Sequence, residues 1–127
     1  MKDSIVIKNA SKLSNLRFLD LSLCLYIGAP ALEAIGKHCK YLTGLCRMLD
    51  FAMKGDYCFD DEAFAIAATM PNLESLEIPK LWFTTYELVF TILASCTHLK
   101  FLDVMGCYCE SPQNIFGCNL IPHFLIT

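Results

Sequence analysis

The stretch DDEAFAIAATMPNLESLEI, residues 60–78, joins a helical pattern to a pattern that suits no amphipathic helix. Its acidic start and alanine-rich body predict a helix with Asp60 as N-cap, because aspartate accepts backbone N–H bonds and helix N-termini favour negative charge. Pro71 cannot continue that helix and pushes Met70 out of helical geometry. An L-x-x-L-x-I pattern then begins at Leu73, with the side-chain alternation of a strand. The stretch therefore predicts a helix, a turn and a short strand.

The same junction recurs along the chain. Four segments share the core L-x-x-L-x-(L/I/V) at steps of 26, 31 and 26 residues, and they begin at Leu16, Leu42, Leu73 and Leu99. The second segment places Arg47 at the last apolar position. Apolar residues at helical spacing precede the three later segments, over residues 31–39, 62–70 and 87–96. The longer middle step predicts an extra loop at about residues 48–58.

This repeating strand, loop, helix and turn matches the leucine-rich-repeat signature in length and pattern. No single unit can bury its apolar face, but stacked units share a core. We therefore predict an α/β leucine-rich-repeat solenoid with about four short parallel strands on the concave face and helices on the convex face. The repeat domain is expected over residues 1–107, with a partial first repeat at 1–13, and an irregular C-terminal tail over 108–127.

Two expectations concern the ends of the chain. A start inside a repeat suggests a fragment, a truncated paralogue or an incomplete gene model, and it leaves the first strand as an unpaired edge. The tail ends in FLIT, which is unusually apolar for a solvated terminus and is a candidate to pack onto the last repeat.

Several strings carry a family resemblance. C-x-x-L-x-x-L at residues 39–45, together with ALEAIGKHCKYL, DDEAFAIAATMPNLESLEI and ILASCTHLKFLDVMGC, resembles the repeats of plant F-box/leucine-rich-repeat proteins over about residues 5–107. The resemblance implies a substrate receptor of an SCF-type ubiquitin ligase, whose repeats hold a protein destined for degradation. Nothing in the sequence matches an F-box, so a Skp-type adaptor is an implied partner only if an F-box exists upstream.

Composition narrows the possible partners and compartments. The net charge is −3, so the chain lacks the excess of positive charge that is typical of proteins that bind nucleic acid or an anionic membrane. No apolar run reaches the roughly 18 residues of a membrane span, and the start is no signal peptide. We therefore expect a cytoplasmic or nuclear protein whose eight cysteines are thiols. The hydrophobic fraction of 55% suggests that some apolar surface lies against something outside the chain.

The cysteines and histidines could in principle react or bind a metal, but their positions favour a structural role. Four cysteines recur at repeat positions, where a thiol fills the gap between units and donates to a backbone carbonyl: Cys24, Cys39, Cys96 and Cys107. A zinc or redox site remains an alternative, built from Cys107, Cys109, Cys118 and His123. The histidines form no triad and no glycine-rich phosphate loop occurs. We therefore predict no enzyme activity, no catalytic residues, no metal and no cofactor.

The concave face is the predicted partner-binding surface. Residues between the buried leucines face outward, and the proposed set is Phe18, Asp20, Ser22, Cys46, Ser75, Glu77, Phe101, Asp103 and Met105. One row across the sheet reads Asp20, Cys46, Glu77 and Asp103. The row is either a solvated acidic face or the binding site of a basic protein substrate with aromatic flanks. A stand-alone regulator or decoy that binds the same substrate without a ligase role is the alternative function.

Overall fold

The computed structural model describes residues 2–24, 26–48, 58–79, 82–83, 87–105, 107–109 and 124–125. The helices are α1 (Asp3–Asn9), the 3₁₀ helix η1 (Ala10–Leu13), α2 (Ala29–His38), α3 (Asp60–Thr69) and α4 (Glu87–Ser95). The strands are β1 (Phe18–Asp20), β2 (Gly44–Cys46), β3 (Ser75–Glu77), β4 (Trp82–Phe83), β5 (Phe101–Asp103), β6 (Tyr108–Cys109) and β7 (Phe124–Leu125).

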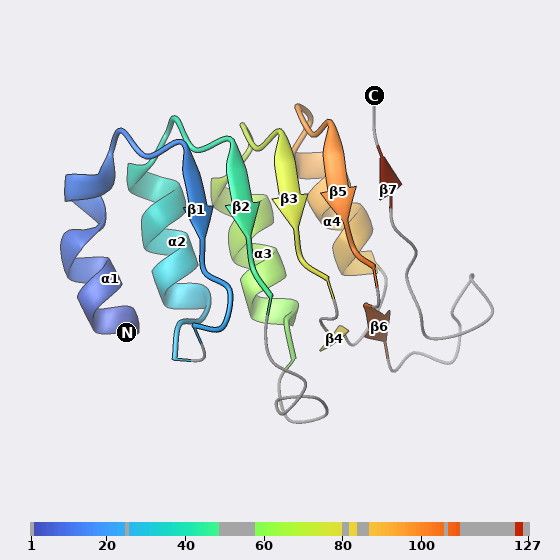
Figure 1. Cartoon of the computed structure of the whole chain (residues 1–127), viewed down its shortest axis with the longest axis horizontal. Helices are drawn as coiled ribbons and strands as arrows, with labels where there is room; N and C mark the ends of the chain where they lie inside the picture. The colour runs from blue at the N-terminus through green and yellow to red at the C-terminus, as the bar shows by residue number, and fades with distance from the viewer. Residues whose placement is uncertain are drawn as a thin grey trace.

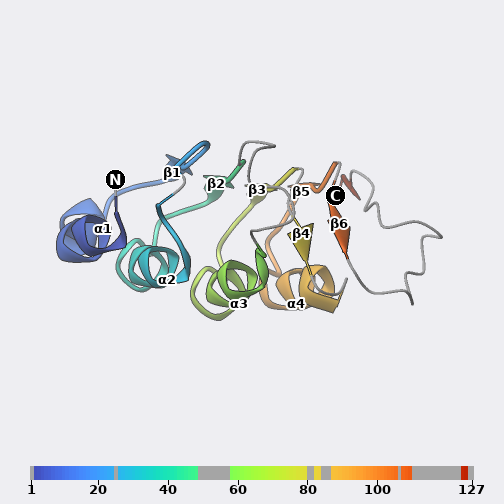
Figure 2. The same ribbon diagram turned by 90° about the horizontal axis from the view of Figure 1, so that it is seen from below.

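Four parallel strands lie side by side with the helices on one side of them (Figures 1 and 2). The main sheet has the order β1-β2-β3-β5-β7, so β1 is an edge strand, as predicted. The register aligns the second leucine of each segment in one row: Leu19, Leu45, Leu76 and Leu102. This mixed α/β arrangement of four parallel strands and four α-helices is compatible with leucine-rich repeats.

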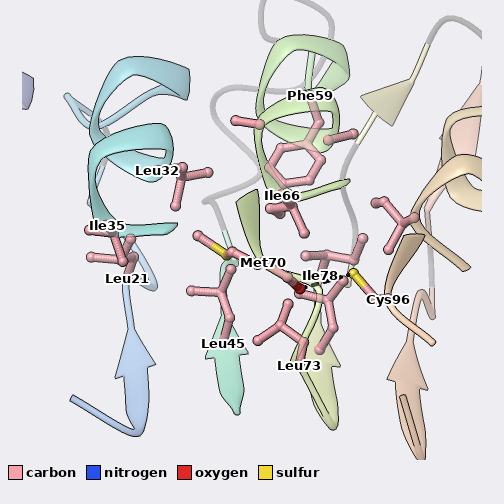
Figure 3. Packing of buried hydrophobic residues seen from close by; sticks show 14 of the residues in the cluster. Leu21, Leu32, Ile35, Leu45, Phe59, Ile66, Met70, Leu73, Ile78 and Cys96 are labelled. Atoms are coloured by element: carbon pink, nitrogen blue, oxygen red, sulfur yellow. Dashed lines mark hydrogen bonds between the residues drawn. The ribbon is translucent and has the colours of Figure 1, made fainter. Parts of the chain in front are cut away.

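One apolar core lies between the strands and the helices. The strand residues Leu45, Leu76 and Leu102 are fully buried, and Ile66 and Ile92 face them from α3 and α4. Figure 3 shows side chains from neighbouring units interdigitating in this layer. Because every unit contributes to the same core, no unit's apolar face is buried by that unit alone.

The helix starts differ from the prediction. Asp60 is not the N-cap of α3: Phe59 takes that position, with no side-chain capping bond, and Asp60 lies in the first helical turn. Phe59 is fully buried, so its packing under the helix fixes where α3 begins. The acidic first turn of Asp60, Asp61 and Glu62 still suits the helix dipole.

The predicted turn after Met70 is confirmed, but Pro71 is not its only cause. Met70 leaves the helix with φ −124° and ψ 58°, as the following Pro71 predicts. Cys39 ends α2 in nearly the same conformation, with φ −99° and ψ 72°, although no proline follows it. Both residues donate a backbone N–H to the residue four positions earlier, Ile66 and Ile35. The turn is therefore a property of the repeat, which Pro71 reinforces.

Three of the four repeat cysteines bond to the preceding unit, as predicted. Their Sγ atoms donate to backbone carbonyls over 3.2 Å (Cys39 to Leu13), 3.3 Å (Cys96 to Met70) and 2.8 Å (Cys107 to Ile78). The Cys96 bond is drawn in Figure 3. All three thiols are buried, whereas Cys24 is half-buried. Each thiol therefore satisfies a carbonyl at the junction between two units.

Arg47 occupies a position that is apolar in the other units, and it is fully buried. Its Nε donates to Glu62 Oε1 over 2.8 Å. Its Nη atoms donate to the backbone carbonyls of Leu21, Cys24 and Ile27. Burial raises the pKa of Glu62, and the Arg47 guanidinium opposes this shift. The Arg47 side chain thus connects the loop after β1 to the first turn of α3 through hydrogen bonds.

The tail contributes two short strands. β6 pairs in parallel with β4, and β7 pairs antiparallel with β5, where Leu125 lies opposite Phe101. Phe124 and Leu125 of the apolar FLIT end therefore pair with the last repeat strand. The predicted extra loop lies largely outside the described residues, as do residues 110–123 of the tail. The division into a repeat domain at 1–107 and a tail at 108–127 stays a prediction.

We predict that Arg47→Leu lowers the free energy of unfolding by about 3–5 kcal/mol, because it leaves Glu62 buried without its cation. The matched control is Lys37→Leu, which removes the cation of the exposed Lys37–Glu33 pair. An exposed pair contributes only about 0–1 kcal/mol. Urea unfolding followed by circular dichroism measures both variants. Equal losses in the two variants would contradict the structural role of the buried pair.

Candidate protein-binding surface

The strands present one side to the helices and the other side outward. We call the residues at the first and third strand positions the outer face: Phe18, Asp20, Gly44, Cys46, Ser75, Glu77, Phe101 and Asp103. The middle residues point to the core because side chains alternate along a strand. The observed register therefore produces the predicted row Asp20, Cys46, Glu77 and Asp103.

Two carboxylates of this row are held by the turns that follow their strands. Asp20 Oδ1 accepts the Ser22 backbone N–H over 2.8 Å, and Asp103 Oδ1 accepts that of Met105 over 2.9 Å. Hydrogen bonds from the Ser22 side chain and backbone lower the pKa of Asp20. Strands β1 and β5 thus carry equivalent, oriented carboxylates, with Glu77 of β3 between them.

Cys46 sits inside the acidic row. Its Sγ lies 3.3 Å from Ser22 Oγ. Burial raises the pKa of the Cys46 thiol, the Ser22 hydrogen bond opposes this, and the charges of Asp20 and Glu77 raise it further. A neutral thiol between carboxylates leaves a row with three acidic groups. Glu77 and Asp103 are direct register partners, and like charges on paired strands are unfavourable unless water or a cation screens them.

Apolar side chains flank the acidic row. Phe18 is 55% exposed, and its ring lies over Gly44, where an added Cβ would overlap it. Met105 is 53% exposed and Phe101 is half-buried. Gly44 and Ser75 separate the two phenylalanines in the register, so they form two anchors and not one patch, as predicted.

The structure therefore places the predicted site residues on the outer face or at its margin. It brings Asp20, Ser22 and Cys46 into contact and sets Glu77 beside Asp103. Partner binding by these residues stays a prediction. Sequence reasoning missed the buried Arg47–Glu62 pair, although an arginine at an apolar repeat position was a signal that a partner would be needed.

Other chemistries find little support in the part of the chain that the structure describes. Within it, no group of three or more histidine, cysteine or acidic side chains could hold a metal ion. Cys118 and His123 of the zinc alternative lie outside the described residues, and Cys107 is buried and donates to Ile78. Among the described helices, none combines the length and the apolar character needed to cross a bilayer.

Stacked strand–helix units with inter-unit cysteine bonds define a class of repeat protein compatible with leucine-rich repeats. No family model matches the chain. It is 46% identical over 123 residues to the F-box protein FBW2 of Arabidopsis thaliana. This match covers 96% of the chain and 38% of FBW2. The chain is 36% identical over 107 residues to the putative F-box/LRR-repeat protein 23 of the same plant, covering 84% of this chain and 23% of that protein.

A further Arabidopsis relative, the F-box protein SKIP1, is 32% identical over 126 residues. This match covers 89% of the chain and 42% of the length of SKIP1. The chain is thus similar over most of its length to plant proteins named as F-box or F-box/LRR-repeat proteins. It spans less than half the length of the relatives it matches.

We predict that the repeat thiols resist alkylation in the folded chain. Burial raises the pKa of Cys96 to about 11, so its thiolate at pH 8 is about a hundredfold rarer than that of an unperturbed cysteine. Because the folded-state pKa is raised, this thiol favours folding below pH 9, and that contribution is lost as pH rises toward 11.

Iodoacetamide labelling at pH 8, resolved by peptide mass spectrometry, measures the effect. Cys96 should react at least a hundredfold more slowly in the folded chain than in urea, and more slowly than half-buried Cys24. Folded-state labelling of Cys96 as fast as that of Cys24 would show that the thiol is reactive and not structural.

Proposed function

We propose that this chain is a leucine-rich-repeat solenoid whose outer, concave face binds a protein segment carrying basic residues. The proposal rests above all on the row of Asp20, Cys46, Glu77 and Asp103, which the strand pairing sets in register. The function is positioning of a partner, without chemistry at the chain's own side chains. The binding protein is the proposed counter-charge for carboxylates that stand beside one another.

The spacing of the acidic residues and the exposed apolar side chains at both ends of the face support an extended, peptide-like partner. Neighbouring strands lie about 4.8 Å apart, so the acidic groups form a line that an extended basic segment can follow. Complementary charge speeds encounter and fixes the register of a partner more than it adds affinity. Phe18 and Met105, both more than half exposed, lie at opposite ends of the face and offer apolar contact.

The relatives give this binding a biological setting. They are F-box proteins by name. We infer that the face acts as the substrate-recognition part of an SCF-type ubiquitin ligase receptor in the cytoplasm or nucleus, and that the chain itself is not an enzyme. A Skp-type adaptor would bind only through an F-box in a longer protein, because the resemblance of this chain covers repeats alone.

We expect a fluorescein-labelled octalysine peptide to bind the chain and to lose about tenfold in affinity in the triple variant Asp20→Asn, Glu77→Gln, Asp103→Asn. Three exposed charge contacts of about 0.5 kcal/mol each correspond to roughly that factor. Fluorescence anisotropy at about 0.1 M salt, where the Debye length is about 10 Å, measures the Kd, and further added salt should weaken binding to the unchanged chain more than to the variant.

The matched control is Glu33→Gln, Asp61→Asn, Glu74→Gln, which removes the same number of charges away from the row. Its Kd should stay within about twofold of that of the unchanged chain, since its charges are screened from the face. A control that weakens octalysine binding as much as the row variant would sink the proposed site. Circular dichroism of both variants shows that the fold is kept.

A further inference from the structure

The turns that join each helix to the next strand stack into one continuous edge. Backbone N–H groups bond each turn to the preceding one over 2.8 Å, in the pairs Thr43 to Arg17, Glu74 to Thr43 and Lys100 to Glu74. Figure 1 shows these turns side by side along the top of the molecule. We call residues 12–17, 37–43, 70–74 and 96–100 the turn edge.

Positive charge gathers on and beside the turn edge. The structure describes eight lysines and arginines, of which Arg47 is buried and Lys2 precedes α1. The other six lie in the last turn of α1 or on the turn edge: Lys8, Lys12, Arg17, Lys37, Lys40 and Lys100. His38 and His98 lie there too. Two carboxylates accompany them, Glu33 paired with Lys37 and Glu74 paired with Lys100. The edge is therefore positive on a chain whose net charge is −3.

Helix dipoles explain only part of this cluster. Lys8 and Lys37 lie in the last turns of their helices, where positive charge stabilises the helix. Arg17 and Lys100 lie outside the helices. The Arg17 guanidinium stands 5.7 Å from the centre of the Tyr41 ring, and Tyr41 is 58% exposed. An exposed arginine–tyrosine pair is a typical anchor of protein interfaces.

We propose that the turn edge is a second binding surface, which takes an acidic segment of a protein partner. A protein segment fits better than nucleic acid, because the acidic outer face and the overall charge of −3 repel a long polyanion, whereas a short acidic segment meets only the local positive field. Arg17 and Tyr41 supply the anchor, and Lys12 and Lys40 of the same two turns supply further positive charge. This proposal stands independently of binding at the outer face, which has the opposite charge.

A fluorescein-labelled octaglutamate peptide tests the proposal with two variants of equal charge change. Lys40→Glu reverses a charge on the turn edge, and Lys2→Glu reverses one at the start of α1, at the other end of the helix layer (Figure 1). We expect Lys40→Glu to raise the Kd about fivefold or more and Lys2→Glu to change it by less than twofold. Lys40 Nζ also donates to Gly36 O over 3.3 Å, so Lys12→Glu serves as a second edge variant with no such bond in the described contacts.

The remaining outcomes separate the alternatives. Absence of octaglutamate binding, or equal weakening by Lys2→Glu and both edge variants, would overturn the turn edge as a site. Tighter binding of an octathymidylate oligonucleotide than of octaglutamate, with the same loss in Lys40→Glu, would overturn the choice of a protein partner. The outer-face triple variant should leave octaglutamate binding unweakened, so failure of one proposal is distinguishable from failure of the other.

Discussion

Stacking of each strand–helix unit on the next is the constraint on which the rest of the structure depends. The strands β1, β2, β3 and β5 are each only three residues long, too short to be stable without neighbours. Three kinds of contact join adjacent units: the parallel ladder, the shared leucine and isoleucine core, and cysteine thiols that bond to a carbonyl of the preceding unit. Close helix contact adds to these, since a Cβ on Gly36 would overlap Thr69 of the neighbouring helix.

Stacking also creates both charged surfaces. The acidic row exists because the third position of each strand meets its counterpart in register, and the positive edge exists because successive turns bond to one another. The hydrogen bonds of Arg47 connect the core to the outer face. Arg47 donates to Leu21, at the start of the loop after β1. In the same loop, Ser22 bonds to Asp20 and contacts Cys46. A buried charge therefore helps to shape the outer face.

Much of the fold follows from the spacing of leucines and cysteines, because residues at equivalent positions of a stacked unit must have equivalent neighbours. That reasoning predicted the four repeat strands, their register, the row from Asp20 to Asp103 and the thiol bonds of Cys39, Cys96 and Cys107. It did not predict the short strands β4, β6 and β7. It failed where packing overrides local preference: buried Phe59 takes the N-cap position, so α3 begins at Asp60, one residue earlier than predicted.

Other features depend on contacts that spacing does not reveal. The Arg47–Glu62 pair joins residues from two elements separated by a loop of no recognisable pattern. The positive edge draws its residues from turns far apart in sequence. For the candidate site, the repeat alignment located the acidic residues, but the Ser22–Cys46 contact and the Phe18 ring over Gly44 required the three-dimensional structure.

The units share one core and present their surfaces as one body. Native-state hydrogen exchange, resolved by strand, tests this most directly because it measures the opening free energy of each unit separately. We expect the buried amides of Leu45, Leu76 and Leu102 to exchange with the same opening free energy and the same denaturant dependence. Separate opening of β2 from β3 and β5, each with its own free energy, would contradict the account.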